Sequence, residues 1–314
     1  MNLQTRLSRV DQLLTNVSLA YVNQNYIADE VLPIVPNLKN DSGLIGSYSN
    51  DHLRIYSAKR SLYDVSQKRI EWKYQQDDRY DIDYFDLETF LPDRLVEQTE
   101  LPFNARRDAM LVVMESLKVE RERSLAAIMS DTSILTQNST LSGTSQWSDY
   151  ANSEPEVDIR NARTAVFNAT GMEANCIQMS RATLEVLKLH PFFLNQVRGV
   201  RLPSEDDVIS ILKSFFGFTK VLIGRAKYVS SKEGQTDVMA DVWGKDLVIY
   251  YAPQTPSLMQ KSFGYSFQLA GRNWTVRTRR EPDSDEGELI KVQHARDDKI
   301  LVPTAAYLYK SVVA

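Results

Sequence analysis

The sequence has little cysteine and little histidine. Its 314 residues include a single cysteine, Cys176, so no disulfide framework can form within one chain. Beside Ile177, this thiol is better explained as a small buried core residue than as a reactive group. The three histidines, His52, His190 and His294, are more than 100 residues apart and have no metal-binding or acid–base motif around them.

Motifs for catalysis are also missing. The chain has no H-E-x-x-H, C-x-x-C, G-x-S-x-G or Walker A sequence. Gly244 and Lys245 are followed by Asp246, so this stretch lacks the hydroxyl that would reach Mg²⁺ in a nucleotide-binding loop. We therefore expect neither enzymatic activity nor a cofactor.

A basic excess and long apolar runs are absent too. The formal charge of -4 argues against a dedicated nucleic-acid binder. The first twenty residues contain no apolar stretch of signal-peptide length. No run approaches the roughly 18 apolar residues of a membrane helix. We expect a protein made and kept in a cytoplasm-like compartment, without a membrane partner.

Aromatic residues are plentiful, with 15 tyrosines and 11 phenylalanines, and exposed aromatics favour a partner that covers them. Residues 3–17 predict an amphipathic helix that is too short to be stable alone. It must dock on its own domain or on a neighbouring subunit. Residues 21–60 carry Pro33 and Pro36 and are expected to form an extended arm.

Long strands are predicted over residues 62–90, with a turn at 75–79. The apolar face slips by one residue after Tyr84, which indicates a bulge or a crossing between two packing environments. Residues 103–129 predict a helix of roughly 40 Å, on which Lys118 and Glu122 form an i,i+4 pair. Arg121 lies on its apolar stripe, so it either snorkels or meets a partner's carboxylate.

The remaining chain alternates helices and strands. A loop over 134–153 precedes a helix that Ser153 or Asp158 would cap. Further helices are predicted near 181–198 and 205–216, and strands near 221–229 and 247–251. The last fifty residues are expected to be all-β, with runs near 262–270, 274–279, 289–293 and 306–313.

Charge order is the most informative chemical pattern. A basic strip over residues 54–73 precedes an acidic strip over 77–88. The two strips could pair within one hairpin, or meet their opposites on a neighbour of identical sequence. Calcium is a third explanation for the acidic strip, and residues 283–288 are better explained as a solvated hairpin turn than as a calcium loop.

Several segments resemble one family, the tailed-bacteriophage major capsid proteins with the Hong Kong 97-type fold. The strings that carry the resemblance are YVNQNYIADEVLPIVP (21–36), GSYSNDHLRI (46–55), LSGTSQWSDYANSEPEVDI (141–159), DVWGKDLVIYYAP (241–253), FGYSFQLAG (263–271) and DDKILVPTAAYLYKSVV (297–313). The resemblance implies an α+β fold with an N-terminal arm (1–44), an extended β-hairpin loop (45–95), a peripheral domain with a long spine helix (96–160), a mixed α/β axial domain (161–258) and peripheral β strands (259–314).

The resemblance also implies a function. Such proteins self-assemble into hexamers and pentamers of an icosahedral head, usually through a procapsid, around double-stranded DNA. Scaffold and portal proteins are the implied partners, a decoration protein is a further one, and the virion is assembled in the bacterial host cytoplasm. No long helical prefix precedes the arm, so we expect no cleavage of a scaffolding segment. The alternatives are an encapsulin-like cellular shell and a tail component.

For a shell protein, the important residues are those at subunit interfaces. We expect the aromatic and charged side chains of the arm and loop to face neighbouring copies. The predicted set is Leu7, Val10, Leu14, Tyr21, Tyr26, Arg54, Lys59, Arg60, Lys68, Arg69, Trp72, Tyr74, Asp81, Asp83, Asp86 and Arg121.

Overall fold

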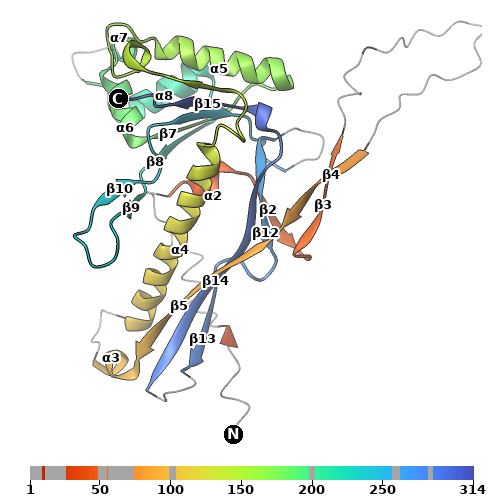
Figure 1. Cartoon of the computed structure of the whole chain (residues 1–314), viewed down its shortest axis with the longest axis vertical. Helices are drawn as coiled ribbons and strands as arrows, with labels where there is room; N and C mark the ends of the chain where they lie inside the picture. Colours follow the sequence, from red (N-terminus) through yellow and green to blue (C-terminus); the bar gives the residue numbers. More distant parts are fainter. Residues whose placement is uncertain are drawn as a thin grey trace, which may run out of the picture.

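Two β-sheets and one long helix form the frame of the protein in a computed structural model (Figure 1). The structure describes residues 9–10, 26–48, 55, 74–98, 104–197, 202–256, 262–281 and 286–314. Among these residues, no helix has the length and apolar character needed to cross a membrane.

The first sheet is six-stranded and is organised around a 14-residue strand, β14 (Gly287–Ile300). This strand pairs antiparallel with three others: β5 (Asp83–Pro92), β13 (Thr275–Arg280) and β12 (Gly264–Leu269). Two short strands extend the sheet, because β2 (Ile34–Leu38) pairs parallel with β12 and β1 (Arg9–Val10) pairs antiparallel with β13.

The long helix α4 (Ala105–Met129) covers one face of this sheet. Asn104 begins it, because its side chain accepts a hydrogen bond from Arg107 N at 3.1 Å. Apolar side chains from the helix and strands then share one buried cluster, which contains Leu91, Met110, Val113, Met114, Leu117, Trp274, Val276, Ile290 and Val292. A short helix, α3 (Asp93–Gln98), joins β5 to this region. The predicted helix over 103–129 is confirmed.

The second sheet has five strands in the order β6 (Asn138–Thr140), β15 (Ala306–Lys310), β11 (Leu247–Tyr250), β7 (Cys176–Ser180) and β8 (Lys220–Gly224). Four helices surround one of its faces (Figure 1): α5 (Pro155–Thr170), α6 (Arg181–Leu189), α7 (Pro191–Gln196) and α8 (Glu205–Phe216). Two 3-10 turns, Gly143–Ser145 and Pro303–Ala305, precede α5 and β15.

Side chains along these strands alternate between the two faces of the sheet, so the other face packs against a second apolar cluster. Val248 and Tyr250 pack with Leu125 and Met129 at the end of α4. The same cluster contains Ile27, Ala28, Val31 and Leu32 from the N-terminal segment, which includes the short helix α2 (Ala28–Val31). Cys176 belongs to this cluster as well, so its predicted burial is confirmed.

Two β-ribbons lie outside the sheets. The first pairs β3 (Ser42–Tyr48) with β4 (Tyr74–Asp81) and projects from the body beside β12 (Figure 1). The second pairs β9 (Lys227–Val229) with β10 (Met239–Asp241). The predicted turn at 75–79 is wrong, because β4 continues through it and pairs with β3. The slip in the apolar face is a change of packing environment within an unbroken strand pairing. Ile82 packs with Leu269 and Ala295, whereas Phe85 packs against the cluster beneath α4.

The N-terminal predictions need correction. Arg9–Val10 is a strand on the edge of β13 rather than part of a helix, and the rest of 3–17 lies outside the described residues. A segment of two heptads gains little as an isolated helix, whereas a sheet edge offers unpaired backbone groups. Residues 27–32 are packed into the core and do not form an extended arm.

The assignment of segments to domains changes as well. β15 completes the five-stranded sheet, so the expected peripheral unit 259–314 is divided between two sheets. The expected boundary between residues 160 and 161 divides α5, and this helix packs over the five-stranded sheet. The helix expected over 181–198 is two helices, because Pro191 begins a new one after His190. The strands predicted near 247–251, 262–270 and 274–279 are confirmed.

Candidate assembly surfaces

A buried carboxylate joins the N-terminal segment to the long helix. Glu122 of α4 is fully buried, and its Oε1 accepts hydrogen bonds from Ile27 N at 2.5 Å and Ala28 N at 2.6 Å. Its Oε2 accepts one from Trp243 Nε1 at 2.5 Å. Burial raises the pKa of Glu122, and the bond from Ala28 partly offsets this effect. Glu122 therefore connects three segments of the chain.

Arg121 lies next to this carboxylate in an ion-pair network. Only 1% of the residue is exposed, and its guanidinium donates to Ser266 Oγ at 3.2 Å, to Asp298 at 3.4 Å and to Asp29. Burial disfavours the charged guanidinium, but Asp298 and Asp29 outweigh it and raise the pKa of Arg121. The carboxylates that meet Arg121 belong to its own chain.

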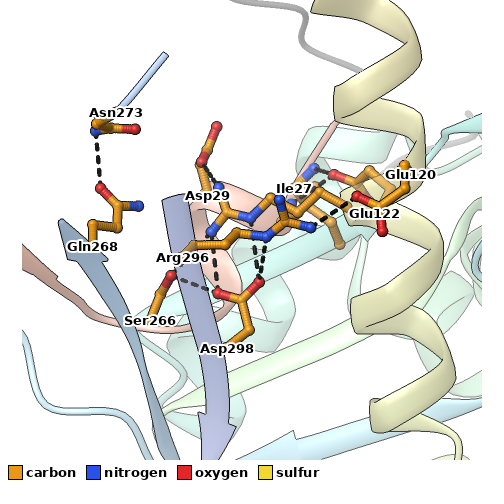
Figure 2. A network of polar contacts seen from close by, with 11 residues as sticks. Ile27, Asp29, Glu120, Glu122, Ser266, Gln268, Asn273, Arg296 and Asp298 are labelled. Carbon is orange, nitrogen blue, oxygen red and sulfur yellow. Dashed lines mark hydrogen bonds and ion pairs between the residues drawn. The ribbon is translucent and has the colours of Figure 1, made fainter. Parts of the chain in front are cut away.

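A second arginine completes this network from β14. Figure 2 shows Arg296 between Asp298 and Glu120, with Ser266 on the neighbouring strand. Arg296 Nε donates to Asp298 at 3.1 Å, and its Nη2 donates to Glu120 at 3.0 Å. Burial opposes the charge of Asp298, but Arg121 and Ser266 hold its pKa below the usual value. The network fixes α4, the N-terminal segment and the six-stranded sheet to one another.

An acid patch, which we define as Asp81, Asp83 and Asp297, lies where the β3–β4 ribbon meets the body. Asp81 and Asp83 are exposed, and neither forms an ion pair with any residue that the structure describes. The Asp81 N–H donates to Asp297 Oδ2 at 3.0 Å. Burial raises the pKa of Asp297, while the Asp81 N–H lowers it. The patch therefore presents carboxylates that the rest of the described chain does not neutralise by direct pairing.

A basic groove of about 460 Å³ lies on the face of the six-stranded sheet opposite α4. It is lined by Tyr84, Asp86, Glu88, Arg272, Arg277, Arg279, Lys291 and Gln293. Its two acids are paired, Glu88 with Arg279 at 3.3 Å and Asp86 with Lys291. Arg272 lies over the Tyr84 ring at 5.3 Å. Arg272 and Arg277 form no ion pair within the described ranges, so the lining residues carry two excess positive charges. One further carboxylate lies at the edge of the groove, where Asp41 Oδ1 accepts a hydrogen bond from the Tyr84 hydroxyl at 2.8 Å.

A buried histidine lies beneath α4. His294 is fully buried, and its ring centroid is 4.3 Å from that of Trp274. Neither ring nitrogen has a hydrogen-bond partner in the described part of the chain. Burial lowers the pKa of His294 well below its usual value, and Arg121, Arg296 and Lys118 lower it further. The ring is therefore neutral over the physiological range of pH.

Seven of the sixteen predicted interface residues lie within the described ranges, and two of these, Asp81 and Asp83, belong to the acid patch. Val10 is in β1, Tyr74 begins β4, and Tyr26 is half-buried with its hydroxyl donating to Glu115. Asp86 pairs within the chain, as does Arg121. Nine residues lie outside the described residues: Leu7, Leu14, Tyr21, Arg54, Lys59, Arg60, Lys68, Arg69 and Trp72.

The sequence reasoning missed Glu122, Asp298 and the arginines of the groove. The available signal for Glu122 was its position three residues before Leu125 and four before Ala126, on the apolar side of α4. Alternation along the predicted strand already places Arg277 and Arg279 on one face, but no sequence signal adds Arg272 or Lys291 to them. Within the described ranges, no group of three or more His, Cys, Asp or Glu residues could hold a metal ion.

Comparisons with known proteins point to phages. No protein-family model matches the chain. The chain is 24% identical over 317 residues to a protein named major capsid protein from Burkholderia phage BcepMu, covering 98% of each chain. It is also 24% identical to a major capsid protein from Pseudomonas phage JBD67, covering 97% of each.

Solved structures share the fold. A phage-related protein from Bordetella bronchiseptica RB50 matches with a TM-score of 0.74 at 22% identity, over 98% of both chains. The capsid of cyanophage P-SCSP1u matches with a TM-score of 0.52 at 11% identity, over 88% of this chain and 86% of that one. The SrpI encapsulin from Synechococcus elongatus matches with a TM-score of 0.51 at 8% identity, over 98% of both. The chain has the α+β fold of these shell proteins.

Proposed function

We propose that this chain is a phage major capsid protein that builds the shell of the virion head by self-association. The observation that carries this proposal is the alignment of 98% of the chain with 98% of a curated major capsid protein. A shared fold alone would not separate a phage head from an encapsulin. The sequence relatives make that distinction, because both are phage capsid proteins.

The assembled product would be a closed icosahedral head of hexamers and pentamers that encloses double-stranded DNA. Scaffold and portal proteins would assist its assembly in the bacterial host cytoplasm, and a decoration protein could be added afterwards. With a formal charge of -4, the chain lacks the lysine and arginine excess that strong phosphate binding needs. Contact with packaged DNA is therefore weak and independent of sequence.

The interfaces would involve the projecting ribbon and the predicted interface residues that precede Tyr26. A two-stranded ribbon is marginally stable alone, so burial on a neighbouring copy would stabilise β3 and β4. The exposed acids Asp81 and Asp83 would then face basic groups of that copy. From the sequence alone, Arg54, Lys59 and Arg60 are one candidate set for these basic groups, and other basic groups of the neighbouring copy are the alternative. The aromatic residues Tyr21, Trp72 and Tyr74 would add apolar contact.

Negative-stain electron microscopy of the expressed protein tests the proposal. We expect closed shells, either from the chain alone or with its scaffold. Tubes would indicate a tail component instead. Particles produced during infection should contain DNA, whereas an encapsulin-like shell would contain a protein cargo. A subunit that stays monomeric under all these conditions would contradict the proposal.

A further inference from the structure

The unpaired arginines and the unpaired aspartates lie on different parts of one chain. Arg272 and Arg277 are in the basic groove, on the β12–β13 turn and on β13. Asp81 and Asp83 are in the acid patch, at the end of β4 and the start of β5. We propose that the basic groove of one copy binds the acid patch of the next copy. This inference rests on the proposed shell function and names the residues of one contact.

The composition of the groove favours a protein partner over a nucleic acid. Interface cores are enriched in tyrosine, phenylalanine and arginine. Tyr84 is 43% exposed in the groove, and Phe90 on the same face of β5 is 46% exposed. Glu88 and Asp86 already neutralise Arg279 and Lys291, so Arg272 and Arg277 are the cations that remain for a ligand. Two cations match a pair of carboxylates better than the long run of phosphates in a nucleic acid. Guanidinium groups bind carboxylates in a bidentate manner, which fixes orientation as well as affinity.

The geometry of a ring favours a second copy as this partner. A contact between two different patches is heterologous, and heterologous contacts form rings when the rotation closes. The groove and the acid patch are two different surfaces with opposite charge, as such a contact requires. Because every copy carries both, each could donate its acid patch to one neighbour and receive the patch of another. Two-fold pairing of groove against groove would bring Arg272 and Arg277 of both copies together, and this repulsion would disfavour it.

Charge reversal tests the contact. The groove variant Arg272→Glu/Arg277→Glu and the patch variant Asp81→Lys/Asp83→Lys should each fail to form shells on its own. The chain that carries all four substitutions should form closed shells again. A control variant, Arg160→Glu/Lys213→Glu, makes the same change in net charge at two residues away from both surfaces and should assemble like the wild type.

A mixture of the two failed variants gives a sharper test. Around a ring, groove-reversed and patch-reversed copies satisfy every contact only if they alternate. Alternation is complete in a ring of six but leaves one repulsive contact in a ring of five. The mixture should therefore form hexamers, sheets or tubes, and far fewer closed shells than the four-substitution chain, as counted by electron microscopy. Circular dichroism of each unassembled variant should match that of the wild type.

Other outcomes separate this contact from its alternatives. If the wild type forms shells and the groove variant forms equally many, the proposed contact is wrong while the shell function stands. If shells persist but their DNA content falls, the groove binds nucleic acid and not a second copy. If reversal of Arg54, Lys59 and Arg60 rescues the patch variant, the acid patch binds those residues and the groove is not its partner. Equal loss of assembly in the Arg160/Lys213 control would also overturn the assignment.

Discussion

Replacing Glu122 should destabilise the subunit more than replacing any exposed acid. Glu122→Ala leaves the N–H groups of Ile27, Ala28 and Trp243 without their acceptor. A buried donor without a partner costs about 1–3 kcal/mol. Burial of the wild-type carboxylate is itself unfavourable, and its removal offsets part of the cost of the three unpaired N–H groups. We therefore expect the free energy of unfolding to fall by about 3–5 kcal/mol, the range for breaking a buried charged contact. Glu122→Gln keeps one acceptor oxygen and should lose about 1–3 kcal/mol.

Urea unfolding of the unassembled subunit measures these losses, followed by circular dichroism and by tryptophan fluorescence. Asp108→Ala is the matched control on the same helix, because Asp108 is an exposed acid in the first turn of α4. It should change the unfolding free energy by less than about 1 kcal/mol. Limited proteolysis adds a local measure, because Glu122→Ala should release the segment around residues 27–32 before the rest of the chain is cut. A free energy for Glu122→Ala within about 0.5 kcal/mol of the wild type would refute the reasoning.

Three further predictions follow from buried groups. Deleting residues 1–25 should leave a subunit that folds, whereas deleting 1–35 removes four core side chains and should unfold it, as judged by circular dichroism; a native spectrum after the longer deletion would contradict the packing of α2. Because the unfolded chain binds a proton at His294 below a pKa of about 6.5 and the folded chain does not, this residue should reduce stability as pH falls below that value. The melting temperature of His294→Phe should therefore fall less than that of the wild type between about pH 6.5 and pH 5. If both proteins show the same dependence of melting temperature on pH, His294 does not contribute. Burial raises the pKa of the Cys176 thiol to about 11, so the native protein should react with a thiol reagent only as fast as it unfolds; prompt labelling would show an accessible thiolate.

The sequence by itself determined the elements whose pattern is local. The helix α4 begins and ends within two residues of the predicted bounds, because its apolar spacing extends over many turns. The strand β11 was found because it is a short apolar run, and β12 because Tyr265, Phe267 and Leu269 alternate with small or polar residues. The resemblance to capsid proteins added the order of the elements, which periodicity alone does not supply.

The tertiary structure decided every question that depends on a partner far away in the chain. Alternation over residues 74–81 predicted strands but could not show that β4 pairs with β3 and continues through the expected turn. β15 was predicted as a strand, and only the fold shows that it completes the sheet with β11. A strand's side-chain pattern records that one face is buried, while the choice of neighbour depends on the packing of the whole sheet.

The same distinction applies to the charged residues. The sequence placed Arg121 on an apolar stripe and required a partner for it, but Asp29 and Asp298 lie 92 and 177 residues away along the chain. The arginines of the groove lie close together in the sequence, but Lys291, Asp86 and Glu88 join them only because β13, β14 and β5 are adjacent in one sheet. A charge can be neutralised by any carboxylate within reach, so the sequence fixes which residues need partners, and the fold alone decides which residues provide them.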